Sequence, residues 1–177
     1  MKRLKNGILG NLAASRASWR RRTYRNATFR EPPKIQSANM VVDGFENSLA
    51  SLKGTTVRTQ NPDRFPEPGI APVDLYFSDG ARSRTDYWRI VRDGKNVTSS
   101  FDHKQQYGLP APIDAFARIA EELDGKTLRE AKWDPRTGDI VLFFEPNVEL
   151  QMFNFTGYED WEITFNNGTG EYSNYAR

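Results

Sequence analysis

Two segments of the chain carry apolar residues at helical spacing. In each, a Phe is followed by a small or aliphatic residue four positions on and by a Leu seven positions on: Phe45, Leu49 and Leu52 in the first segment, and Phe116, Ala120 and Leu123 in the second. Residues at this spacing share one face of a helix, so the pattern predicts two short amphipathic helices. Gly54 and Gly125 lie two residues after the Leu of each segment, where a left-handed glycine commonly ends a helix.

Strand-like patterns follow both predicted helices. In residues 73–77, apolar positions alternate with polar or amphipathic ones, which predicts a strand with one buried face. Residues 140–144 are apolar at both odd- and even-numbered positions, and residues 150–155 are nearly so. Both faces of these strands therefore have to be buried. Helices can cover one face, and the other needs a second sheet layer, a second copy of the chain in a homodimer, or a partner. A second sheet layer is the interpretation we favour.

These elements recur in the same order, which predicts an internal repeat. The matched segments are residues 73–80 with 140–147 and residues 86–90 with 159–163, which puts Trp88 and Trp161 at equivalent positions. We therefore expect two pseudo-repeats, residues 43–108 and 109–177, each a short helix followed by an antiparallel β-meander of about four strands. Two copies are too few for a solenoid, so they should pack as one α+β domain with pseudo-twofold symmetry.

The net charge of the chain, +2, conceals a strong asymmetry. Residues 1–34 hold ten basic residues and one acidic residue, a net charge of +9, whereas the rest holds 15 basic and 22 acidic residues, a net charge of −7. We therefore divide the chain into a basic arm, residues 1–39, and a single α+β domain, residues 40–177. The acidic domain favours a protein partner with a basic surface, because opposite charges accelerate association.

The basic arm contains one dense motif in which arginines lie among aromatic residues. Its members are Trp19, Arg20, Arg21, Arg22, Tyr24 and Arg25. Arginine pairs with phosphate and aromatic rings stack on bases, so one interpretation is nucleic-acid binding through residues 1–34. A second is a transit peptide within residues 1–30, which would direct the protein to an organelle. A third is a solvated, disordered tail, or an extension ahead of a true translation start at Met40.

Composition removes most catalytic and metal-binding classes. The chain has no Cys and one His, which excludes disulfides, zinc fingers, iron–sulfur clusters, thiol nucleophiles and any site that needs two imidazoles. The sequence has no Gly-rich phosphate loop, and no apolar run approaches the roughly 18 residues that span a bilayer. We therefore expect no cofactor, no metal, no transmembrane segment and a cytoplasmic location.

One short segment combines the residue types of a hydrolase: Ser99, Ser100, Asp102 and His103. A catalytic triad, however, is assembled from separated elements beside an oxyanion site. Strand alternation would place Ser100 and Asp102 on one face and His103 on the other. We therefore expect a polar strand end or loop here, at a binding surface. A carboxylate-based hydrolase stays open as an alternative, because two catalytic carboxylates need only spatial proximity.

A second segment places three carboxylates around an indole ring. We expect the ring of Trp161 to lie in the core, with the acids solvated and available to a basic partner. Residues 87–90, 99–103 and 158–163 resemble segments of small, acidic, uncharacterised bacterial proteins, some of which look like immunity proteins of toxin–antitoxin or contact-inhibition systems. The resemblance covers the acidic domain only, and it implies no catalytic residue.

The resulting hypothesis is a non-enzymatic protein-interaction domain that neutralises a basic toxin, such as a nuclease, by occlusion through an acidic aromatic face. The candidate partner-binding residues are Asp86, Tyr87, Asp102, His103, Tyr158, Glu159, Asp160 and Glu162. The alternatives are a nucleic-acid-associated protein that uses its Arg-rich arm and, after it, a carboxylate-based hydrolase.

Overall fold

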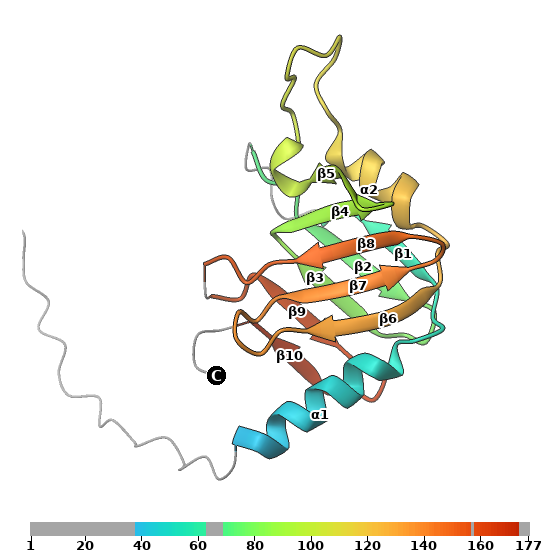
Figure 1. Cartoon of the computed structure of the whole chain (residues 1–177), viewed down its shortest axis with the longest axis vertical. Helices are drawn as coiled ribbons and strands as arrows, with labels where there is room; N and C mark the ends of the chain where they lie inside the picture. Colours follow the sequence, from blue (N-terminus) through green and yellow to red (C-terminus); the bar gives the residue numbers. More distant parts are fainter. Residues whose placement is uncertain (1–37, 63–68, 157, 174–177) are drawn as a thin grey trace, which may run out of the picture. The chain divides into compact units, whose positions relative to one another are not determined.

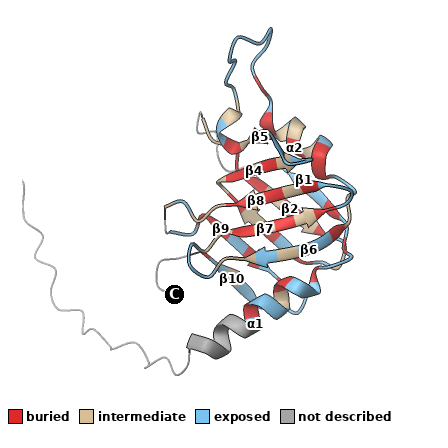
Figure 2. Cartoon of the chain, viewed as in Figure 1, coloured by how far each residue is buried: buried red, intermediate tan, exposed pale blue. Residues whose placement is uncertain are grey.

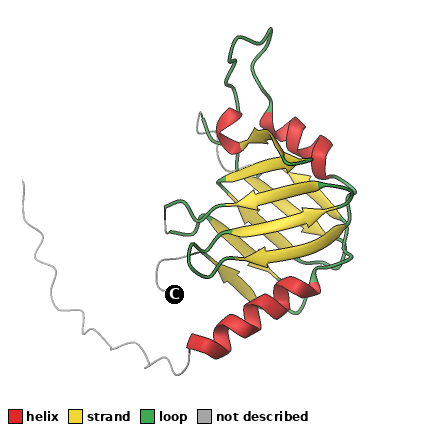
Figure 3. Ribbon diagram, in the orientation of Figure 1, coloured by secondary structure: helices red, strands yellow, loops and turns green. Residues whose placement is uncertain are grey.

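The computed structural model describes residues 38–62, 69–156 and 158–173, so the Arg-rich motif of the basic arm lies outside the described residues. Within these ranges the chain forms two α-helices, one short 3-10 helix and ten strands (Figure 1, Figure 3). In chain order they are α1 (Ala38–Ser51), β1 (Val57–Gln60), β2 (Val73–Phe77), β3 (Arg82–Thr85), β4 (Trp88–Arg92), β5 (Lys95–Ser99), η1 (Ser100–Asp102), α2 (Ala115–Leu123), β6 (Leu128–Trp133), β7 (Ile140–Phe144), β8 (Val148–Met152), β9 (Trp161–Thr164) and β10 (Gly170–Tyr172).

The strands form two five-stranded antiparallel sheets. The first has the order β1-β2-β3-β9-β10, and the second has the order β5-β4-β8-β7-β6. Buried apolar side chains from both sheets belong to one core, so the sheets pack face to face (Figure 2). The predicted α+β class, antiparallel pairing and two helices are therefore confirmed. In the part of the chain that the structure describes, neither helix is long and apolar enough to cross a membrane.

Strand β7 has the continuous apolar sequence described above, and its two faces are buried to different extents. Ile140, Leu142 and Phe144 are fully buried between the sheets, whereas Val141 and Phe143 lie on the outer face and are half-buried. Full burial of such a side chain contributes about 1.5–3 kcal/mol relative to leaving it exposed. The favoured interpretation, a second sheet layer, is therefore confirmed for the inner face of this strand.

The predicted meander of about four strands is wrong, because each half sends its last two strands to the opposite sheet. Strands β1, β2 and β3 form a meander in the first sheet, and β4 and β5 then join the second. Strands β6, β7 and β8 form a meander in the second sheet, and β9 and β10 join the first. Each sheet has one apolar face, and the two apolar faces pack against each other. Because of the exchange, each of these faces contains strands from both halves of the chain.

The two sheet-to-sheet crossovers, residues 86–87 and residues 153–160, meet at one end of the sandwich. The main-chain N–H of Asp86 donates to the carbonyl of Asp160 at 2.9 Å, and the N–H of Phe153 donates to the carbonyl of Tyr87 at 2.9 Å. These bonds continue the pairing of β3 with β9 and of β4 with β8. The crossovers therefore hold residues from both halves of the chain side by side.

Helix α1 packs beside β6 through the face that the sequence predicts. Phe45 and Leu49 are buried, as is Leu52 just beyond the end of the helix. The Phe45 ring meets the Trp133 ring edge-on at a centroid distance of 5.3 Å and stacks on the Trp161 ring at 5.8 Å. Trp161 is 1% exposed, which confirms its predicted place in the core.

Helix α2 differs from its prediction in the face that it buries. Leu123 is buried as expected, but Ile119 is buried in place of its neighbour Ala120, and Phe116 is only half-buried. The core face is therefore rotated by one position, and Phe116 lies at its edge, where its ring packs against the core and against the His103 ring. Asp114 precedes the first turn, where its carboxylate accepts hydrogen bonds from two main-chain N–H groups and caps the helix.

The two predicted helix-ending glycines adopt the left-handed conformation, with φ of 87° at Gly54 and 77° at Gly125. Their main-chain contacts are reciprocal. The N–H of Gly54 donates to the carbonyl of Leu128 at 2.7 Å, and the N–H of Gly125 donates to the carbonyl of Val57 at 2.8 Å. The segment after each helix is therefore tied to the start of the first strand of the other half.

Candidate functional site

Three aromatic side chains form an exposed cluster at the crossover end of the sandwich. Tyr87 comes from the crossover before β4, Phe101 from η1, and Phe155 from the crossover before β9. The Tyr87 ring lies 5.6 Å from the Phe101 ring and 5.1 Å from the Phe155 ring, and the two phenylalanine rings are 6.1 Å apart. Phe101 is 46% exposed and Phe155 is 67% exposed. We call Tyr87, Phe101 and Phe155 the aromatic cluster.

The end of β8 explains the exposure of Phe155. Val148, Leu150 and Met152 fill the inward positions of the strand and are buried. Because alternate residues point to opposite faces, Phe153 and Phe155, which follow the strand at odd-numbered positions, point outward like Glu149 and Gln151. Phe153 is covered by the guanidinium of Arg89, which lies 5.4 Å from its ring, whereas Phe155 stays exposed.

The segment that carries Phe101 is a 3-10 turn, so the strand alternation predicted for residues 99–103 is wrong. The Asp102 carboxylate accepts hydrogen bonds from the main-chain N–H and the hydroxyl of Ser99, at 2.7 and 3.2 Å, and thereby stabilises the turn. Ser100 is buried, and its hydroxyl oxygen accepts a hydrogen bond from the N–H of Trp88 at 3.3 Å. These bonds orient the turn so that the Phe101 ring stacks on Tyr87 and stays 46% exposed.

Carboxylates from the two crossovers gather next to the aromatic cluster. Asp86 forms an ion pair with Arg84 at 3.2 Å. Burial raises the pKa of Asp86 above its ordinary value of 3.8; Arg84 lowers it, and the charges of Asp160 and Glu162 raise it further. The pKa of Tyr87 is likewise raised, first by burial and then by Asp160 and Asp86. The structure therefore brings four of the predicted partner-binding residues close together.

Asp160 does not have the solvated carboxylate that the sequence pattern led us to expect. The residue is 5% exposed, and its two carboxylate oxygens accept hydrogen bonds from the main-chain N–H and the hydroxyl of Thr156, at 2.6 and 2.7 Å. A buried carboxylate needs such donors, so Asp160 is committed to shaping the crossover. The side chains of Tyr158 and Glu159 in the same crossover are exposed, with Tyr158 at 78%.

The side chains of Asp102 and His103 make contacts within the fold. The His103 ring packs against Phe116 at a centroid distance of 4.7 Å, and its Nδ1 atom accepts a hydrogen bond from the N–H of Ala115 at 3.4 Å. Burial lowers the pKa of His103, although the nearby Asp114 carboxylate opposes that effect. Asp102 caps η1, so these two predicted residues support the segments around the cluster.

No arrangement of nucleophile and base joins Ser99 or Ser100 to His103 within the described ranges, because both serines and the imidazole bond to other groups. In the same ranges, no group of three or more His, Asp or Glu side chains could hold a metal ion. What the geometry offers is an aromatic surface beside carboxylates. Such surfaces commonly bind other proteins.

The sequence-based reasoning did not identify Phe101 and Phe155 as site residues. Phe155 could have been identified from its odd-numbered position, because Val148, Leu150 and Met152, the buried residues of β8, are at even-numbered positions. The signal for Phe101 was a large apolar residue among the polar residues of Ser99-Ser100-Phe101-Asp102-His103.

Comparison with protein-family models gives no match for this chain, and neither the curated proteins nor the solved structures include a match. The function of the aromatic cluster is therefore argued from its own chemistry.

Proposed function

We propose that residues 40–177 are a non-enzymatic protein-interaction domain of the immunity type, which blocks a basic toxin such as a nuclease. The docking face combines the aromatic cluster with the carboxylates of Asp86, Glu159 and Glu162. The mechanism is occlusion, in which the acidic face covers the cleft that the toxin uses to bind phosphate. The proposed compartment is the cytoplasm, because a chain without Cys needs no oxidising environment.

The observation that carries this proposal is the exposure of two phenylalanines that pack on Tyr87 at the surface. Phe101 is 46% exposed and Phe155 is 67% exposed, although folding alone would favour the burial of such large apolar side chains. Clustered aromatic side chains are the residues that most often dominate binding energy in protein interfaces. The cluster is therefore the strongest candidate in the domain for a surface that a partner buries.

The charge next to the cluster supports a basic partner. Residues 35–177 hold a net charge of −7, and the raised pKa of Asp86 reflects in part its crowding with Asp160 and Glu162. A Lys or Arg side chain of a partner placed near Asp86 relieves that crowding. The attraction accelerates association and weakens with added salt. Because Asp86 takes up a proton at a higher pH than an ordinary Asp, the attraction also weakens early as the pH falls.

We further propose that the domain consists of two equivalent halves, residues 43–108 and 109–177. The indole N–H of Trp88 donates to the carbonyl of Ala71 at 2.6 Å, and that of Trp161 donates to the carbonyl of Gly138 at 2.8 Å. Each acceptor lies two residues before the second strand of its half. These paired contacts support the proposal. The halves differ in their crossovers, which contain two and eight residues, and the aromatic cluster lies there.

Capture of a partner by matched variants tests the proposed function. The full chain, a Phe101→Ala/Phe155→Ala variant and a Leu109→Ala control are used to capture proteins from native lysate in low and high salt. Leu109 is a suitable control because it is an exposed apolar residue, at 40%, outside the cluster. We expect a basic protein to be retained in low salt by the wild type and the control, and to be lost with the Phe variant. The wild type should also inhibit the activity of the purified partner.

Two outcomes would contradict the proposal. One is the failure to recover any basic partner in low salt, or recovery that is equal with the Phe101→Ala/Phe155→Ala variant. The other is self-association of the wild type in sedimentation experiments that the Phe variant abolishes, because the cluster would then be covered by a second copy of the chain.

A further inference from the structure

The outer face of the first sheet carries a row of arginine and tyrosine side chains that the proposed function does not use. The antiparallel register aligns Arg58 of β1, Tyr76 of β2, Arg82 of β3 and Thr164 of β9. Tyr76 is half-buried, and the other three residues are exposed. The row therefore places one aromatic ring between two arginines on adjacent strands.

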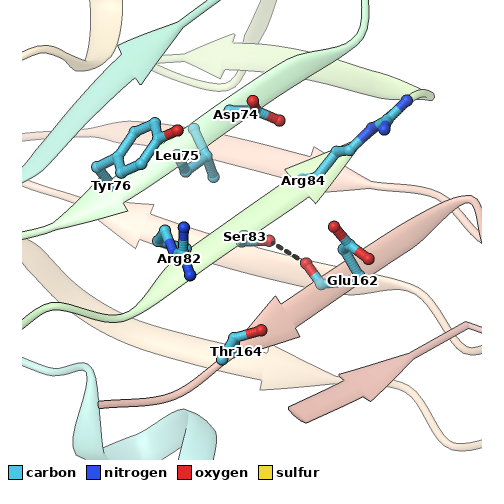
Figure 4. Close-up of a pocket in the computed structure, with 8 residues that line it drawn as sticks. All are labelled: Asp74, Leu75, Tyr76, Arg82, Ser83, Arg84, Glu162 and Thr164. Carbon is cyan, nitrogen blue, oxygen red and sulfur yellow. Dashed lines mark hydrogen bonds between the residues drawn. The ribbon is translucent and has the colours of Figure 1, made fainter. Parts of the chain in front are cut away.

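Tyr76 separates two hollows on this face. The first is lined by Tyr76, Arg82, Thr164, Asp74, Arg84 and Glu162 (Figure 4), and the second by Tyr76, Arg58, Thr59 and Gln60. Figure 4 shows the side chains of Tyr76 and Arg82 next to each other on neighbouring strands. The ring is thus accessible from a concave surface on either side, and each hollow has its own arginine.

The charges on this face leave the two arginines of the row available. The carboxylates of Asp74 and Glu162 belong to the next row, where the register places both opposite Arg84. Neither Arg58 nor Arg82 forms an ion pair with any residue in the described ranges. The row itself is therefore cationic on a domain that is acidic as a whole, and the carboxylates of Asp74 and Glu162 balance the two arginines that line the first hollow.

The outer face of the second sheet has no comparable site. There the ring of Phe143 lies opposite Glu149 in the β7–β8 register, where Tyr76 lies opposite Arg82. Lys132 lies 5.0 Å from the centre of the Phe143 ring, but its ammonium group pairs with Glu130 at 3.2 Å. Arg89 lies 5.4 Å from the centre of the Phe153 ring on the same outer face, and its guanidinium donates a hydrogen bond to the side-chain carbonyl of Gln151. Both of these cations are thus engaged by a neighbouring side chain, whereas Arg58 and Arg82 form no ion pair within the described ranges.

We propose that the row binds a nucleotide, with the base stacked on Tyr76 and the phosphate held by Arg58 or Arg82. The planar guanidinium group matches the geometry of a phosphate, and base stacking on an aromatic side chain tolerates any base. Two strand spacings separate the arginines by about 10 Å between Cα atoms, which leaves room for one ring between two phosphate-binding groups. Residues 35–177 hold a net charge of −7, which repels a long polyanion from this domain, so a single nucleotide is favoured over a strand.

The test uses the full chain with Arg20, Arg21 and Arg22 replaced by Gln, which removes the densest cationic run of the basic arm and leaves seven of its ten basic residues. Residue-specific shifts distinguish binding at the row from binding at the rest of the arm. Amide chemical shifts are followed by NMR during titration with adenosine 5′-monophosphate. We expect saturable shifts at Tyr76 and Arg82. Adenosine and ribose 5-phosphate, which each lack one half of the ligand, should bind at least about tenfold more weakly.

Variants identify the side chains that bind. In the same background, Tyr76→Ala and Arg58→Ala/Arg82→Ala should each weaken nucleotide binding about tenfold or more. The matched control is Lys132→Ala, which removes the paired cation of the other sheet and should change nothing. Circular dichroism and urea denaturation establish that each variant is folded.

Several results would overturn the inference. They are the absence of saturable shifts at Tyr76, equal binding by the double arginine variant, and binding of ribose 5-phosphate as tight as that of the nucleotide. A short oligoadenylate that binds more than about tenfold tighter than the nucleotide would make a strand the ligand instead. The inference does not depend on the toxin-blocking function, because the titration contains no protein partner and probes Tyr76, Arg58 and Arg82, which lie outside the proposed docking face. Glu162 belongs both to that docking face and to the lining of the first hollow. Either proposal can fail while the other holds.

Discussion

Truncation of the two exposed phenylalanines should cost much less stability than truncation of a core phenylalanine. Phe144 is fully buried, and a Phe→Ala substitution at such a position costs about 3–5 kcal/mol. Phe101 is 46% exposed and Phe155 is 67% exposed. Scaling the cost of the core substitution by the buried fraction gives about 1.5–2.5 kcal/mol for Phe101→Ala and about 1–1.5 kcal/mol for Phe155→Ala.

Urea denaturation of the full chain, followed by tryptophan fluorescence, measures the three free energies of unfolding. The expected order of destabilisation is Phe144→Ala, then Phe101→Ala, then Phe155→Ala, with similar denaturant slopes. A cost for Phe155→Ala as large as that for Phe144→Ala would refute the reasoning, because the cluster would then be part of the core. A cost well below that of Phe144→Ala means that the two rings are not part of the core and leave apolar surface that an interface can bury.

Three further predictions concern the fold. Trp88→Phe should destabilise the domain by about 1–3 kcal/mol in the same assay, since it leaves the fully buried carbonyl of Ala71 without its hydrogen-bond donor. Trp161→Phe should cost less, because the carbonyl that loses its donor belongs to Gly138, which is half-buried. Gly138→Ala should cost at least about 1 kcal/mol, because φ is 79° and the added Cβ would lie 2.7 Å from a neighbouring side-chain amide nitrogen; no change would contradict this. Hydrogen bonds from Arg136 lower the pKa of Asp134 to about 2, so the stability linked to this carboxylate is present above pH 3.8 and lost as the pH falls toward 2. An NMR titration should show that Arg136→Ala raises the pKa of Asp134 toward 3.8.

Local elements of the fold could be predicted from the sequence because their causes are local. The glycines at positions 54 and 125 end the helices through their left-handed conformation, as their place two residues after the Leu of each helical pattern predicts. The exchange of strands between sheets could not be predicted, because it depends on which apolar faces meet. Residues 86–87 carry no turn signal that distinguishes a crossover to the other sheet from a hairpin within one sheet.

The candidate site was predicted in part, for a similar reason. Asp86, Tyr87 and Asp160 come together because the pairing of β3 with β9 continues into the two crossovers. Asp102 and His103 were grouped with them by residue type, but a capping bond and ring packing commit these side chains to the fold. Polarity alone cannot distinguish a side chain that caps a turn from one that faces a partner.

The most direct test of the central claim is the dissociation constant of the complex with the captured basic partner. We expect the Phe101→Ala/Phe155→Ala variant to bind at least about a hundredfold more weakly than the wild type at physiological salt, since two central aromatic contacts are lost. The Leu109→Ala control should bind like the wild type. An unchanged dissociation constant for the Phe variant would contradict the claim that the aromatic cluster is the docking face.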